Sequence, residues 1–137
     1  MSFYLDTSAV FKLILAEKES EALSKKVRGE VFSSALAKLE VSRTIDRVAA
    51  ENSLPDFQEV AQNKAHSQFN GINFVELDST VLGLASSFQG LPYLGSLEAI
   101  HLASALLIKR EISTFITYEK QLARAAELMG FEVAAPA

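Results

Sequence analysis

Residues 3–15 read FYLDTSAVFKLIL and join a short strand to the start of a helix. The apolar run Phe3–Leu5 is typical of a buried strand. Asp6–Ser8 consists of residue types that cap helices, and apolar residues then recur with helical spacing over Val10–Leu15. The stretch therefore predicts a strand that leads directly into a helix.

The same unit recurs along the chain, with serines at 33 and 34 and an aspartate at 78 expected to cap the helices that follow them. Alternating strands and helices predict a parallel sheet covered by helices on both faces. We expect an α/β fold, a three-layer α/β/α sandwich with a central parallel sheet of four to five strands, in one domain over residues 1–137. The further strand patterns lie at 31–32, 72–77, 113–117 and 131–133, and the helical patterns at 17–27, 35–50, 55–69, 81–88, 97–108 and 119–129.

Composition excludes several classes of protein. The hydrophobic fraction is 49% and the charged fraction 22%, as in soluble globular proteins. The absence of cysteine excludes disulfides, thiolate nucleophiles and cysteine zinc sites. The N-terminus does not resemble a signal peptide, and the longest apolar stretch, Ala99–Ile108, is too short to span a bilayer. We therefore expect a cytoplasmic protein with no membrane partner.

The formal net charge of −4 bears on the choice of ligand. A protein that binds nucleic acid through phosphate contacts alone is usually basic. A nucleic-acid ligand therefore requires bound cations to supply positive charge locally.

Four acids lie where the predicted sheet would bring them to one end: Asp6, Glu40, Glu98 and Glu119. Ligands of such sheets bind outside the carboxyl ends of the strands. Each acid also has a structural explanation. Asp6 can cap the next helix, Glu98 and Glu119 can face helix dipoles, and Glu40 can pair with a neighbour on its own helix.

Clustered carboxylates favour a divalent cation, because their charges otherwise repel one another. Oxygen-rich sites take Mg²⁺ or Mn²⁺, which can activate water and stabilise charge on a phosphoryl group. Glu98 lies in an otherwise apolar helix, where an unpaired charge is costly. Zinc hydrolysis is not expected, because the two histidines form no HExxH pattern. His101 is expected to be a buried histidine satisfied by a hydrogen bond.

Four segments together resemble the motifs of the PIN-domain family, in order and spacing. They are YLDTSA at 4–9, AKLEVSR at 37–43, LEAIHLASAL at 97–106 and FITYEKQLA at 115–123. The resemblance implies an endoribonuclease in which Asp6 and Glu98 hold Mg²⁺ (Mn²⁺ is possible) and Glu40 and Glu119 complete the acid cluster. It also implies assistance from Thr7 and Thr117. The short chain is similar to VapC-type toxins, which implies an RNA substrate, a homodimer and a cognate antitoxin.

Basic side chains near the acids could contact RNA, in particular Lys12 and Arg43. The default interpretation of each is a charged side chain on the solvated surface. The family usually has aspartate where this chain has Glu98 and Glu119. One alternative is therefore a catalytically weakened PIN-fold scaffold that binds RNA or antitoxin without efficient cleavage. A DNA nuclease is a second alternative, although the related flap nucleases are longer. A receiver domain is a third, although the paired acids that it needs are missing from the first strand.

Overall fold

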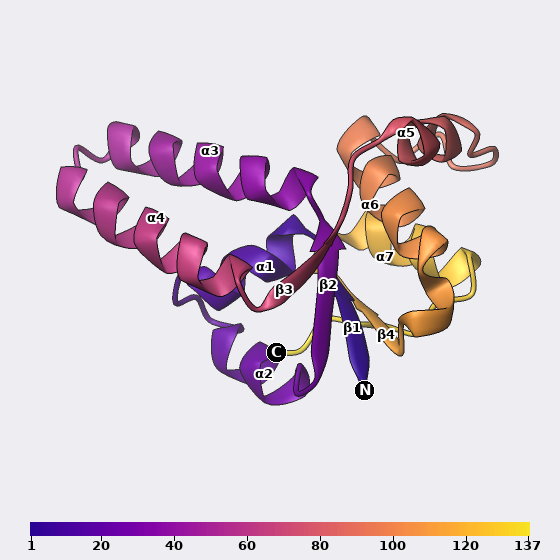
Figure 1. The fold of residues 1–137 in the computed structure, drawn as a ribbon, viewed down its shortest axis with the longest axis horizontal. Coiled ribbons are helices and arrows are strands. Elements are labelled where there is room, and N and C mark those ends of the chain that lie inside the picture. Colours follow the sequence, from indigo (N-terminus) through magenta and orange to yellow (C-terminus); the bar gives the residue numbers. More distant parts are fainter.

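The computed structural model describes residues 1–137 and contains one five-stranded sheet (Figure 1). The strand order is β3-β2-β1-β4-β5, and every neighbouring pair is parallel. The strands are β1 (Ser2–Leu5), β2 (Glu30–Ser34), β3 (Ile72–Val75), β4 (Thr114–Ile116) and β5 (Val133–Ala134). The predicted parallel sheet and its fifth strand are thus confirmed.

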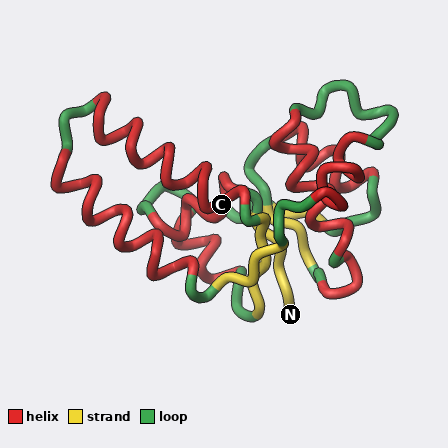
Figure 2. The backbone as a smooth tube through the Cα atoms, turned by 45° about the horizontal axis from the view of Figure 1, so that its top comes forward, coloured by secondary structure: helices red, strands yellow, loops and turns green.

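Helices cover both faces of this sheet, which gives the expected three layers (Figure 2). One group consists of α1 (Thr7–Ile14), α2 (Ser20–Lys26), α3 (Leu36–Glu51) and α4 (Pro55–Phe69). The other group consists of α5 (Ser79–Ser86), α6 (Ser96–Leu107) and α7 (Lys120–Leu128), with a 3₁₀ turn, η1, at Lys109–Glu111. The α3–α4 hairpin projects well beyond the strands (Figure 1). None of the helices combines the length and apolarity that crossing a bilayer requires.

Two hydrophobic cores lie on the two faces, and β1 contributes to both. Phe3 and Leu5 pack with α1 to α4, whereas Tyr4 packs with α6 and α7. All three side chains are fully buried. This follows from the strand period of two, which points successive side chains to opposite faces. A strand covered on both sides reads as a continuous apolar run, as residues 3–5 do.

The order of the strands creates a crevice between β1 and β4. These strands are neighbours, in the register Phe3↔Thr114 to Leu5↔Ile116. The helices that follow them, α1 and α7, pack in different cores and so cover opposite faces. The connections leaving β1 and β4 therefore diverge, and such a switch point is where open α/β sheets bind ligands.

Several local expectations need correction. Ser33 and Ser34 belong to β2, and Ser33 Oγ donates to the Leu5 carbonyl at 2.6 Å instead of capping a helix. Ser34 alone reaches the next helix, where its Oγ accepts from Leu36 N at 3.1 Å. Phe131 precedes β5 and fills the core.

The helix α6 is less buried than its sequence suggests, because Leu97 and Leu107 at its two ends are nearly half exposed. The cap at Asp78 is confirmed, since its Oδ1 accepts from Val81 N at 3.0 Å.

Candidate functional site

A cleft of about 410 Å³ brings together the four predicted acids, Asp6, Glu40, Glu98 and Glu119. They reach it from four places: the ends of β1 and β4, the second turn of α3 and the first turn of α6. The sheet therefore gathers carboxylates that are up to 113 residues apart in the chain. The same cleft is lined by His101, Thr7 and Lys12.

Asp6 is buried at the floor of the cleft, with 3% of its surface exposed. Its Oδ1 accepts from Ser8 Oγ at 2.6 Å and from Ala9 N at 3.1 Å, and its Oδ2 accepts from Thr117 Oγ1 at 2.7 Å. Burial raises the pKa of Asp6 above its ordinary value, although nearby His101 and these hydrogen bonds oppose the shift. Asp6 is thus both the cap of α1, as the sequence predicted, and a carboxylate of the cleft.

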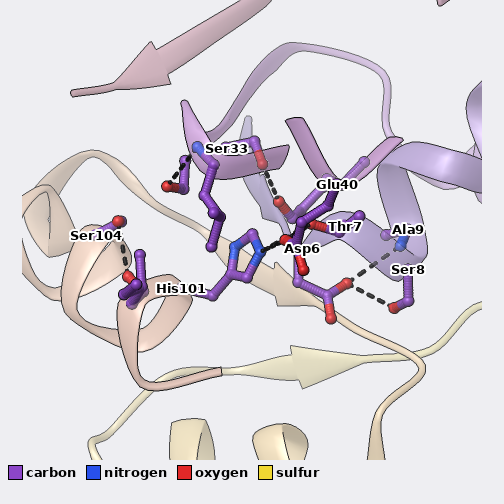
Figure 3. Close-up of polar contacts among 12 residues, drawn as sticks. Asp6, Thr7, Ser8, Ala9, Ser33, Glu40, His101 and Ser104 are labelled. Atoms are coloured by element: carbon purple, nitrogen blue, oxygen red, sulfur yellow. Dashed lines mark hydrogen bonds and ion pairs between the residues drawn. The ribbon is translucent and has the colours of Figure 1, made fainter. Parts of the chain in front are cut away.

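Glu40 is held by two side chains from other elements (Figure 3). Its Oε1 receives a hydrogen bond from Thr7 Oγ1 and lies 3.2 Å from His101 Nε2. Burial raises the pKa of Glu40, but the hydrogen bonds from His101 and Thr7 outweigh it and leave the pKa below its ordinary value. Glu40 is therefore not a surface residue paired along its own helix.

Glu98 and Glu119 are more open than Asp6 and enter no ion pair. The Glu98 carboxylate folds back toward the start of α6, where a Cβ on Gly95 would lie 2.6 Å from its Oε2. Glu98 is the third residue of the helix, the position from which a glutamate reaches back to the helix start. The Glu119 amide donates to Thr117 Oγ1 at 3.0 Å, which orders the turn after β4.

Two side chains that the sequence analysis did not place in the site, Ser8 and His101, connect its parts. Ser8 Oγ donates to Asp6 and accepts from Tyr118 N at 3.2 Å, so it joins the ends of β1 and β4. Its position two residues after Asp6 was the available signal. His101 was expected to be buried and hydrogen-bonded, and it is, but its partners Tyr4, Thr7 and Glu40 were not foreseen.

Of the two basic candidates, only Lys12 lines the cleft. Its Nζ lies 3.4 Å from Glu17 and 3.3 Å from Glu19, and 4.8 Å above the Tyr118 ring. Arg43 is exposed outside the lining and lies 3.6 Å from Asp46. The structure therefore brings Lys12, but not Arg43, to the acids.

The donor set suits a hard divalent cation, because the cleft offers carboxylate and hydroxyl oxygens and no sulfur. In the present side-chain positions no three acidic or histidine groups converge closely enough to hold one ion. Mg²⁺ commonly uses only one or two carboxylates and keeps several waters. The residues therefore fit such an ion in two ways. Water molecules can supply most of its ligands, or Glu98 and Glu119 can turn toward it by a change of rotamer.

Comparison with known proteins defines the class. A model of the PIN domain family matches residues 3–128, and this chain belongs to that family. Ribonuclease VapC47 of Mycobacterium tuberculosis (strain CDC 1551 / Oshkosh) is 34% identical over 139 residues, which cover 97% of this chain and 96% of the relative. Ribonuclease VapC46 of M. tuberculosis (strain ATCC 25618 / H37Rv) is 35% identical over 138 residues, 98% of each chain. The resemblance inferred from the four motifs is therefore confirmed.

Solved structures show the same fold. A VapBC2 structure from Rickettsia felis, bound to a DNA fragment from the promoter, matches with a TM-score of 0.71 at 12% identity, over 100% of both chains. VapC20 of M. tuberculosis, a sarcin–ricin loop cleaving toxin, matches with a TM-score of 0.70 at 13% identity, over 98% of this chain and 99% of its own. At such low identity the likeness concerns the fold.

Proposed function

We propose that this protein is a VapC-type ribonuclease toxin that hydrolyses RNA phosphodiester bonds with the help of Mg²⁺ or Mn²⁺. The observation that carries the proposal is the meeting of four acids from separate segments in one cleft at the β1/β4 switch point. The names of the full-length relatives, which are ribonucleases, support the same reaction.

Asp6 and Glu98 would hold the cation, and Glu40 and Glu119 would complete the acid cluster and orient water. When bound, the cation supplies a water of lowered pKa and a positive charge for the phosphoryl group. Thr117 and Ser8 fix both oxygens of Asp6, and Thr7 fixes one oxygen of Glu40. These hydrogen bonds keep the carboxylates oriented before substrate arrives, which is the chain's own share of catalysis.

Lys12 is the basic side chain in position to meet a phosphate at the cleft. Its side chain is only 11% exposed and is held between Glu17 and Glu19. RNA would compete with these two acids for the ammonium group. We assign Lys12 to the phosphate contact and leave Arg43 as a peripheral candidate on α3.

The partners in this proposal are RNA, a cognate antitoxin and a second copy of the chain, in the cytoplasm. The fold shared with the VapBC2 assembly supports the antitoxin. A gene for a small DNA-binding protein directly upstream, and a stable complex on co-expression, would test that partner. Light scattering of the purified chain tests the homodimer, because a monomeric mass would contradict it.

RNA cleavage by antitoxin-free protein tests the reaction. We expect cleavage with Mg²⁺ or Mn²⁺, none after chelation, and a loss of at least about a hundredfold in Asp6→Ala. Equal activity of wild type and Asp6→Ala would refute the mechanism.

The non-convergence of the acids favours one alternative, a PIN-fold scaffold that binds RNA or antitoxin without efficient cleavage. Glu98 and Glu119 are each one methylene longer than the aspartates usual in the family. Glu98→Asp and Glu119→Asp discriminate between the two functions. A large gain in cleavage favours the scaffold, whereas a loss favours an enzyme adapted to its glutamates.

A further inference from the structure

A chain of hydrogen bonds runs from the core of the sheet to the cleft through Tyr4, His101 and Glu40. The Tyr4 hydroxyl lies 2.9 Å from His101 Nδ1. On the other side of the ring, His101 Nε2 lies 2.9 Å from Thr7 Oγ1 and 3.2 Å from Glu40 Oε1. Tyr4 is fully buried and His101 is 3% exposed, so these contacts lie away from bulk solvent.

The contact with Glu40 requires a proton on Nε2 of the His101 ring. Glu40 is an acceptor, so Nε2 must donate to it, and Thr7 donates to the same oxygen. In the neutral ring Nδ1 is then an acceptor, and the Tyr4 hydroxyl is its donor. A phenolic hydroxyl is protonated at neutral pH, so Tyr4 can act as this donor.

The chain of hydrogen bonds ends on one side of the Glu40 carboxylate. Both donors meet Oε1, and no side-chain hydrogen bond reaches Oε2. These two hydrogen bonds thus hold Glu40 in place and leave its second oxygen, Oε2, free. An oxygen left free on an oriented carboxylate is what water or a hydrated cation needs.

We propose that Tyr4 and His101 are positioning residues, in which the Tyr4 hydroxyl selects the Nε2–H tautomer of His101 and this tautomer orients Glu40 in the cleft. The inference deepens the proposed function and rests on it for the role of Glu40. Mutation of a residue that hydrogen-bonds to a metal ligand and orients it typically lowers metal affinity or activity about 10- to 100-fold. Tyr4 therefore acts on the reaction without touching the substrate.

The test is made on the metal-free full chain by long-range ¹H–¹⁵N correlation spectra of the histidine rings. The chain has only one other histidine, His66, which is exposed on α4 and serves as the internal reference. We expect pure Nε2–H for His101 in the wild type and a mixture of tautomers in Tyr4→Phe. Any other tautomer in the wild type overturns the proposal, whether or not the protein cleaves RNA.

Tyr93→Phe is the matched control. The Tyr93 hydroxyl is buried without a hydrogen-bond partner, and its ring packs against the same core as Tyr4. We expect Tyr4→Phe to weaken Mn²⁺ binding, measured by calorimetry, and to lower kcat by about tenfold with KM nearly unchanged. Tyr93→Phe should leave all three quantities unchanged.

The outcomes separate the two proposals. A wild type that neither binds Mn²⁺ nor cleaves RNA contradicts the proposed function, while the tautomer still reports on His101. A cleaving wild type whose Mn²⁺ affinity and kcat are unaffected by Tyr4→Phe overturns the positioning role. If Tyr4→Phe fails to fold, the wild-type spectrum still decides the tautomer.

Discussion

At the scale of single residues, Asp6 shows a conflict between stability and site chemistry. Its carboxylate is buried, and burial disfavours the charged form that a cation site needs. Ser8, Ala9 and Thr117 reduce this cost by donating three hydrogen bonds. The raised pKa of Asp6 indicates that the reduction is incomplete without a cation.

Asp6→Asn should therefore stabilise the metal-free protein at neutral pH while abolishing cleavage. We expect a gain of about 1 kcal/mol, or roughly 3–6 °C in Tm. Because the folded-state pKa of Asp6 is raised, wild-type stability is higher below the ordinary pKa and falls as the pH rises through the folded-state pKa. The advantage of the variant should thus disappear in acid. Thermal melts from acid to neutral pH measure it, and a variant that melts below the wild type at neutral pH would contradict the argument.

Gly95 and Glu98 form a second pair at this scale. A Cβ on Gly95 would lie 2.6 Å from Glu98 Oε2, so Gly95→Ala must displace the carboxylate. We expect Gly95→Ala to weaken Mn²⁺ binding a few-fold in the wild-type background and to have no effect in Glu98→Asp, whose shorter side chain does not reach Gly95. A double-mutant cycle by calorimetry measures this coupling. Equal effects in both backgrounds would show that Gly95 acts only as a helix cap, since that cost is common to both.

The meeting of the four acids in one cleft was predictable, but most of their contacts were not. Asp6, Glu40, Glu98 and Glu119 follow from motifs that are local in sequence, and all four line the cleft. The hydrogen bond between Glu40 and His101 joins residues 61 apart. It depends on how α3 and α6 sit on opposite sides of the sheet, which no local pattern specifies.

At the scale of elements, α6 links the core to the cleft. Glu98, His101, Leu102 and Ala105 have the spacing i, i+3, i+4, i+7 and so share one face of the helix. Leu102 and Ala105 lie in the core, whereas Glu98 and His101, nearer the start of the helix, line the cleft. Packing of Leu102 and Ala105 therefore sets the position of both polar side chains. The sequence predicted this helix from its apolar content but overestimated the burial of its ends, because periodicity does not reveal where neighbouring elements stop.

Leu102→Ala and Leu107→Ala compare the two sides of this helix with the same chemical change. Leu102 is fully buried and Leu107 is 45% exposed. We expect Leu102→Ala to lower the free energy of unfolding by about 2–5 kcal/mol through loss of apolar contact and a residual cavity. Leu107→Ala should cost less than about 1 kcal/mol. Denaturant titrations measure the free energy of unfolding of both variants. Similar losses in the two variants would contradict the assignment of Leu102 to the core.

Strand positions were predicted better than strand ends. The run at residues 3–5 is apolar throughout because β1 is covered on both faces. Strand β2 extends through Ser33 and Ser34, although serine is typical of helix starts. The Ser33 hydroxyl is satisfied inside the sheet by the Leu5 carbonyl of β1, a contact that appears only when the two strands are paired.

At the scale of the whole molecule, the proposed function requires an acidic chain to bind a polyanion. The net charge is −4, and the candidate cleft is lined by five acids, with Glu17 added to the four predicted ones, and by a single basic side chain, Lys12. Repulsion between this cleft and RNA phosphates should dominate in the absence of a cation. Substrate affinity and cation binding are therefore coupled, each strengthening the other.

RNA binding should consequently depend on divalent cations even when no cleavage occurs. With Ca²⁺ as an oxygen-liganded substitute, we expect a labelled RNA oligonucleotide to bind at least about tenfold more tightly than in chelator at matched ionic strength, measured by fluorescence anisotropy. Asp6→Asn should lose most of this gain, because it removes a carboxylate from the cleft while keeping the fold. The variant also separates a bound cation from general screening of the acidic surface, since screening acts on both proteins alike. An equal gain in wild type and variant would mean that the cation acts on the RNA or on the surface as a whole, and that the acids of the cleft do not recruit it.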